Sequence, residues 1–251
     1  MSAMRAFQTV YTMWLREMLR FKRAKSRIVG SLATPLFFLI ILGTAIGSSY
    51  NIESYREFMA PGIIAMVILF SSIFGGVSIL WDREFGFLKE ILIAPVSRFF
   101  VALGKAFGGV TTAMIQGILL MIIAGSVGVE YQSLIGVLAS IPIMFVIGVG
   151  FISLGIALAS RIESHEGFQM VMSFLTMPLV LLSGAFFPLS QLPQWLKTAV
   201  YLNPLTYGVE ALRWALYGEP EIPITVCMIV LLLFATITTA IGSWLFGRTK
   251  V

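Results

Sequence analysis

Apolar positions along this chain gather in long uninterrupted blocks instead of alternating with polar ones. A helix needs about 20 apolar residues to cross the hydrocarbon core of a bilayer, because each residue adds 1.5 Å. Six blocks reach roughly that length. The pattern therefore predicts an all-α polytopic membrane protein with six transmembrane helices, at residues 28–47, 59–80, 99–125, 134–159, 168–187 and 222–246.

The residues before the first block show a different pattern, with apolar side chains at helical spacing on one face and polar side chains opposite. This spacing predicts an amphipathic helix lying in the membrane interface, followed by a basic linker. We therefore divide the chain into a cytoplasmic interfacial segment, residues 1–27, and a transmembrane domain, residues 28–251. The apolar face carries Phe7, Val10, Tyr11, Trp14, Leu15, Met18 and Leu19, and the polar face Arg5, Gln8, Thr12, Arg16 and Arg20.

Composition and charge set the orientation. Of the 251 residues, 58% are apolar and 12% charged, against about 25% charged in a typical soluble domain. Seven basic residues precede the first span, four belong to the second connection when Lys105 at the adjoining end of the third span is included, and one and two lie in the fourth and C-terminal connections. The opposite side has Arg56, Lys197 and Arg213. This asymmetry predicts cytoplasmic termini, in the cell membrane (inner or plasma). It favours membrane lipid as a partner and argues against nucleic acid.

Several kinds of chemistry lack the residues they need. One cysteine, Cys227, and one histidine, His165, give no disulfide and no histidine-based metal cluster. The central turns of the predicted spans carry no charge, and Lys105 is expected to snorkel to the cytoplasmic side. No phosphate-binding G-x-x-x-x-G-K-[ST] loop occurs. We expect no catalytic residue, no metal and no cofactor in this chain, so that pumping requires energy from a partner.

The connection after the second span is cytoplasmic and yet strongly apolar. Phe87, Leu88, Ile91 and Leu92 fall on one face of a short predicted helix, which starts with acidic residues and ends at Pro95. A short exposed helix with such a face must bury it in lipid headgroups or in a protein groove. We favour the groove.

The outer connection, residues 188–221, is also too apolar for a free loop. Pro193 is placed to start one helix, Asn203-Pro204 to break it, and residues 207–217 to form a second. We predict two re-entrant helices, with Glu210 and Arg213 three residues apart and able to pair. They cap the bundle, gate an exit, or do both; the candidate gate residues are Trp195, Asn203, Pro204, Tyr207, Glu210 and Arg213.

Small residues recur within the spans, notably Gly104 and Gly108, and Gly148, Gly150 and Gly155. Glycines at such spacing let helices approach closely, within one chain or across a dimer. We interpret these glycines as intrachain packing positions.

Three sequence runs together resemble the type-2 ABC transporter permeases. They are residues 84–98 followed by Gly104-Lys105, residues 187–196, and residues 203–207 continuing through Arg213 to Gly218. The resemblance covers essentially the whole chain. The chain is similar in size and layout to the single-domain permeases for nodulation lipo-oligosaccharides, anthracyclines and surface polysaccharides.

The resemblance implies the type-2 ABC exporter fold and gives the apolar cytoplasmic segment a partner. By it, this segment is the coupling helix that sits in a groove of a separate ATP-binding cassette ATPase, and residues 161–167 form a second cytoplasmic contact. It further implies a homodimer with two ATPase copies, which bind the ATP and Mg, and a path lined by the first, second and fifth spans. The coupling residues are Glu84, Gly86, Phe87, Leu88, Glu90, Ile91, Leu92 and Pro95.

The leading function is therefore the permease subunit of an ATP-driven exporter, which moves a lipid-linked, glycan or hydrophobic drug-like cargo outward. One alternative is a stand-alone carrier or channel, which lacks the intramembrane charges it needs. The other is a membrane-embedded lipid-modifying enzyme. Its best polar cluster, Glu163, His165 and Glu166, is more typical of a solvated turn than of a metal or catalytic site.

Overall fold

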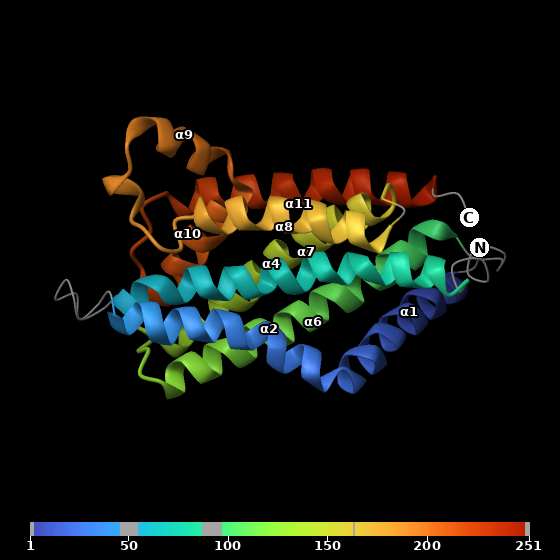
Figure 1. The fold of residues 1–251 in the computed structure, drawn as a ribbon, viewed down its shortest axis with the longest axis horizontal. Coiled ribbons are helices and arrows are strands. Elements are labelled where there is room, and N and C mark those ends of the chain that lie inside the picture. The colour runs from blue at the N-terminus through green and yellow to red at the C-terminus, as the bar shows by residue number, and fades with distance from the viewer. Residues whose placement is uncertain (1–2, 46–54, 87–96, 163, 249–251) are drawn as a thin grey trace.

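In the computed structural model, residues 3–45, 55–86, 97–162 and 164–248 are described, and every regular element among them is a helix (Figure 1). The elements are α1 (Ala3–Arg23), α2 (Lys25–Phe37) with its continuation η1 (Phe38–Leu42), α4 (Tyr55–Glu84), α6 (Arg98–Ser126), α7 (Leu134–Ala159), α8 (His165–Leu181), η2 (Leu189–Gln191), α9 (Gln194–Leu202), α10 (Pro204–Tyr217) and α11 (Ile224–Gly247).

Five of these segments are long and apolar enough to cross a bilayer: Ile28–Ala45, Tyr55–Asp82, Arg98–Ser126, Leu134–Ala159 and Ile224–Gly247. They correspond to five of the six predicted spans. The chain is thus a multi-pass membrane protein.

The fifth predicted span, at residues 168–187, differs from the helix observed. Helix α8 has 17 residues, at the lower limit of the length that crosses a bilayer. It starts early because the Ser164 side chain accepts a hydrogen bond from the Gly167 amide at 3.0 Å. It ends early because the chain turns after Leu181 and Gly184 adopts a left-handed φ of 71°. The apolar run continued past the helix, so its end was predicted too late.

Helix α4 forms the centre of the bundle, because 78% of the residues in its most apolar stretch are buried. Its closest neighbour is α7: a Cβ placed on Gly76 would lie 2.5 Å from the Gly155 carbonyl carbon. No larger residue fits there without separating the two helices. This contact, together with Gly104 and Gly108 below, confirms intrachain packing for three of the predicted glycines.

Helix α1 lies against α6 and meets α2 at an angle near Ala24 (Figure 1). A Cβ on Gly104 would lie 2.6 Å from the Met13 Cβ, and one on Gly108 would lie 2.6 Å from the Glu17 Cβ. The Trp14 indole nitrogen also donates to the Thr111 hydroxyl at 3.1 Å. The amphipathic helix therefore packs on protein along one side, while Phe7, Tyr11 and other apolar residues of α1 stay exposed.

The two ends of the bundle carry different parts of the chain. The start of α1, the start of α6 and the end of α11 share one end, where the Arg98 side chain donates to the Gly247 carbonyl at 2.8 Å. Helices α9 and α10 lie at the opposite end (Figure 1). The first and last described helices thus have their outer ends on the same side of the bundle.

Candidate functional site

The predicted coupling segment begins where α4 ends. Glu84 is the exposed last residue of α4, and Phe85 after it is 81% exposed. Gly86 has a φ of 73°, a left-handed conformation that strains other residues. The remaining coupling residues, Phe87, Leu88, Glu90, Ile91, Leu92 and Pro95, lie outside the described residues, so the coupling role stays a prediction.

A buried cluster of charges lies immediately before this segment. Asp82, in the last turn of α4, accepts hydrogen bonds from Arg16 and from Arg20, the latter at 3.3 Å, both on α1. Its second carboxylate oxygen accepts from the Lys105 ammonium of α6. Arg20 also pairs with Glu17 at 3.5 Å. One carboxylate thus joins three helices.

The cluster corrects the expectation that Lys105 snorkels to water. Lys105 is 3% exposed and is held by Asp82 and by the Ser78 hydroxyl at 3.4 Å. Arg16 and Arg20, predicted on the polar face of the interfacial helix, turn toward Asp82 of α4. The helical spacing of residues 16 and 20 was visible in the sequence, but nothing local to Asp82 indicated that it would meet them.

The cluster reaches the start of α8 through aromatic contacts. The Arg20 guanidinium lies 5.7 Å from the centre of the Trp81 ring. Trp81 stacks on His165, with ring centres 5.9 Å apart and planes 12° from parallel. His165 is therefore half-buried against an aromatic ring, which differs from the solvated turn we expected, and the described residues hold no metal-binding group of three or more ligand side chains.

The position of the cluster has a mechanical consequence. Buried ion pairs are costly to break one partner at a time, because the remaining charge stays desolvated. Asp82 thus ties the end of α4 to both α1 and α6. A stand-alone carrier would need a free carboxylate to bind its coupling ion. Asp82 is not free, because its carboxylate is paired with three cationic side chains.

At the opposite end, the two helices predicted between residues 188 and 221 are present as α9 and α10. Asn203 separates them: its side-chain oxygen accepts from the Leu205 amide at 2.9 Å and its nitrogen donates to the Leu179 carbonyl at 2.7 Å. Pro204 is the first residue of α10, where its missing N–H costs nothing. The break is therefore a helix cap fastened to the end of α8.

Glu210 and Arg213 of α10 form the predicted ion pair, and both are buried. Arg213 also donates to the Gly184 carbonyl at 3.0 Å and lies 4.4 Å from the centre of the Phe58 ring of α4. Glu210 accepts from the amides of Glu221 and Ile222. Burial raises the pKa of the Glu210 carboxyl, against the opposing effect of the Arg213 charge.

Five of the six candidate gate residues therefore gather around α10, where Tyr207 donates to the Tyr201 carbonyl at 2.8 Å. Trp195 stands apart on α9 and is 74% exposed. The polar groups of the pair join α10 to α4 and to the loops on both sides of it. These contacts hold α10 firmly in place, and moving it would require them to break together.

Comparison with known protein families gives a match that extends over both ends of the bundle. The family model for ABC-2 type transporters matches residues 8–217, which include the charge cluster and the Glu210–Arg213 pair. The chain belongs to the ABC-2 type transporter family.

Curated relatives align over nearly the whole chain. Nodulation protein J of Rhizobium leguminosarum bv. viciae is 25% identical over 241 residues, covering 94% of this chain and 92% of its own length. The inner membrane transport permease YadH of Escherichia coli K12 is 27% identical over 229 residues, covering 89% and 88%. The transport permease ycf38 of Cyanophora paradoxa is 29% identical over 213 residues, covering 82% and 73%. Permeases of this family work with an ATP-binding subunit.

Proposed function

We propose that this chain is the membrane subunit of an ATP-driven exporter. In this proposal two copies form the path, two copies of a separate ATP-binding cassette ATPase bind the ATP and Mg, and the chain itself catalyses nothing. The observation that carries the proposal is the family match over residues 8–217. The 251 residues contain no phosphate-binding loop of their own, so hydrolysis falls to the partner.

The membrane arrangement belongs to the same proposal. We propose six spans, with α8 as the fifth, cytoplasmic termini, and α9 and α10 re-entering the outer side of the cell membrane. The charge cluster at Asp82 then lies on the ATPase side and the Glu210–Arg213 pair on the outer side. The helix ends support this, because α1 starts and α11 ends at the end of the bundle away from α9.

The orientation has a direct test. With Cys227 changed to Ser, single cysteines are placed at Ser2, Ser190 and Thr249 and probed in intact cells with an impermeant thiol reagent. Only the cysteine at Ser190 is expected to react, because the basic residues hold the other two inside. Labelling of Ser2→Cys or Thr249→Cys without permeabilisation contradicts the topology.

The export function is tested in cells, without knowing the cargo beforehand. Strains lacking the permease, and strains whose partner ATPase has lost its phosphate-binding lysine, are compared with wild type for surface and internal lipids and glycans. We expect both strains to lose the same component from the surface and to retain it inside. Loss in the permease strain alone, with normal export in the ATPase variant, contradicts ATP-driven export.

A further inference from the structure

The end of α4 and the start of α8 meet at a pair of stacked rings. Trp81, in the last turn of α4, faces His165, the first residue of α8, with ring centres 5.9 Å apart and planes 12° from parallel. Stacked aromatic rings attract each other at separations of about 4.5–7 Å between ring centres. The two helices are therefore joined by a ring-on-ring contact at this end of the bundle.

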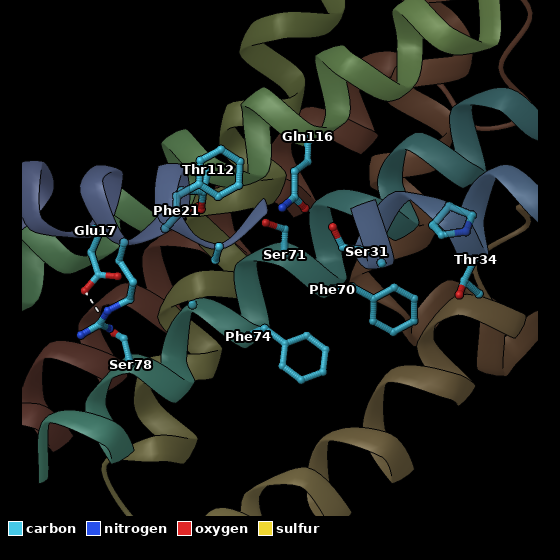
Figure 2. Close-up of a pocket in the computed structure, with 16 residues that line it drawn as sticks. Glu17, Phe21, Ser31, Thr34, Phe70, Ser71, Phe74, Ser78, Thr112 and Gln116 are labelled. Carbon is cyan, nitrogen blue, oxygen red and sulfur yellow. Dashed lines mark hydrogen bonds and ion pairs between the residues drawn. The ribbon is translucent and has the colours of Figure 1, made fainter. Parts of the chain in front are cut away.

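The Trp81 ring is also connected to α1. The Arg20 guanidinium lies 5.7 Å from the centre of the Trp81 ring, within the distance of about 6 Å at which a cation is attracted to an aromatic face. Arg20 is itself held by the Asp82 carboxylate at 3.3 Å and by the Glu17 carboxylate at 3.5 Å, the latter contact marked by a dashed line at Glu17 (Figure 2). His165 thus stacks on a ring whose position is set by α1 and by the buried charge cluster.

The His165 ring is oriented by this stack and not by a hydrogen bond at Nδ1. That nitrogen is buried and has no hydrogen-bond partner among the residues that the structure describes. Histidines that bind metals or transfer protons usually have a ring nitrogen hydrogen-bonded to a neighbouring acceptor, which fixes the tautomer. The contribution of His165 at this position is therefore its flat ring.

Both rings lie beside segments that are expected to contact the ATPase. The predicted coupling segment begins at the exposed Glu84, three residues after Trp81. His165 itself belongs to the predicted second cytoplasmic contact, residues 161–167. A protein that binds both segments makes two tethered contacts, so the second contact depends on how well the spacing between the segments is held.

We propose that Trp81 and His165 are positioning residues, which hold the end of α4 and the start of α8 at a fixed separation so that one ATPase subunit binds both segments at once. The inference rests on the proposed function and adds the residues that set the geometry of the ATPase-binding surface. Both residues act through the segments that they join, and His165 contributes its ring, not a proton.

The separation is measured first, in the permease without its ATPase. In a Cys227→Ser background, spin labels at Phe85→Cys and Arg161→Cys, both exposed positions, report the distance between the two segments in lipid nanodiscs. Labelled chains are diluted with unlabelled chains, so that only distances within one chain are recorded. We expect a narrow distance distribution with His165 in place, a broad one with His165→Ala, and a narrow one with His165→Phe, which keeps the ring.

Binding is measured second, as the affinity of the purified permease for its partner ATPase. His165→Ala is expected to weaken binding about tenfold, because a loosely held spacing lowers the effective concentration of the second contact. The thermal unfolding midpoint is expected to change little, since His165 is only half-buried. His165→Phe is expected to restore the affinity, whereas His165→Asn, which is polar and has no ring, is expected to bind as weakly as His165→Ala.

Two further variants isolate the stack. Trp244→Ala removes another contact between a ring and a cation at the same end of the bundle, where the Arg248 guanidinium lies 4.1 Å from the centre of the Trp244 ring. This control is expected to bind the ATPase normally. The double variant Trp81→Ala with His165→Ala is expected to bind no more weakly than Trp81→Ala alone, because the two side chains form one interaction.

The proposal is overturned if His165→Ala leaves the distance distribution or the affinity unchanged, or if His165→Phe fails to restore them. Weaker binding at an unchanged distance means that His165 contacts the ATPase directly, which excludes a positioning role. A fall in the unfolding midpoint that parallels the loss of binding also overturns the proposal, since the stack then serves folding. If the wild-type permease binds no ATPase, the proposed function fails, whereas the distance measurement still decides whether the stack holds the two segments.

Discussion

Asp82→Ala is expected to cost about 3–5 kcal/mol of folding stability, the range for breaking a buried ion pair from one side. The change leaves the Lys105 ammonium buried and without its carboxylate, while Arg16 and Arg20, which are partly exposed, can turn to water. The measurement is the thermal unfolding midpoint of the purified permease. We expect a large decrease, together with release of α1 from α4, detected as increased proteolysis between α1 and α2.

A double variant distinguishes charge from packing. Asp82→Ala with Lys105→Met removes both buried charges and is expected to regain most of the lost stability, because a pair replaced by apolar residues is often neutral. Glu84→Ala, an exposed carboxylate two residues further along, is the control and is expected to change the midpoint little. If Asp82→Ala unfolds at the wild-type midpoint, the charge cluster does not hold these helices together.

Leu88→Asp is expected to abolish association with the ATPase while the permease still inserts and dimerises. If Phe87, Leu88, Ile91 and Leu92 fill a groove of the partner, this change places an unpaired carboxylate in a desolvated contact, at a cost of about 2–5 kcal/mol. That corresponds to a loss of about 30-fold or more in affinity. The measurement is co-purification of the ATPase with the tagged permease, at equal membrane levels of the permease.

Lys89→Ala provides the matched control, since Lys89 lies beside the apolar stripe and is expected to change co-purification little. If the stripe only rests on lipid headgroups, Leu88→Asp weakens membrane insertion and leaves the complex intact. Wild-type yield of the complex with Leu88→Asp contradicts the assignment of this segment as the coupling helix.

Much of the fold could be predicted because apolar length is a direct physical requirement of the bilayer. Five spans follow from it, and the two outer helices follow from Pro193 and Asn203-Pro204, where proline chemistry acts locally. The Glu210–Arg213 pair was predictable for the same reason, since residues three apart on a helix are neighbours. In each case the decisive information lies within one continuous stretch of the chain.

The features that were missed depend on contacts distant in sequence. Asp82 meets Arg16 across 66 positions and Lys105 across 23, and no local pattern marks such a meeting. The end of α8 was misplaced because apolarity continues through Gly184, where the backbone turns. The cavity beside Gln116 (Figure 2) is likewise lined by four helices, α1, α2, α4 and α6. The sequence alone therefore indicated only an ordinary interhelical contact for the Gln116 amide.

The central claim is that energy for this permease comes from a separate ATPase, and the most direct test measures ATP hydrolysis in liposomes. The purified chain alone, the chain with its partner ATPase, and the same complex with the ATPase's phosphate-binding lysine replaced are compared. We expect hydrolysis by the intact complex, none by the chain alone, and none by the lysine variant. Hydrolysis by the isolated chain, or transport by the isolated chain driven by an ion gradient, contradicts the account.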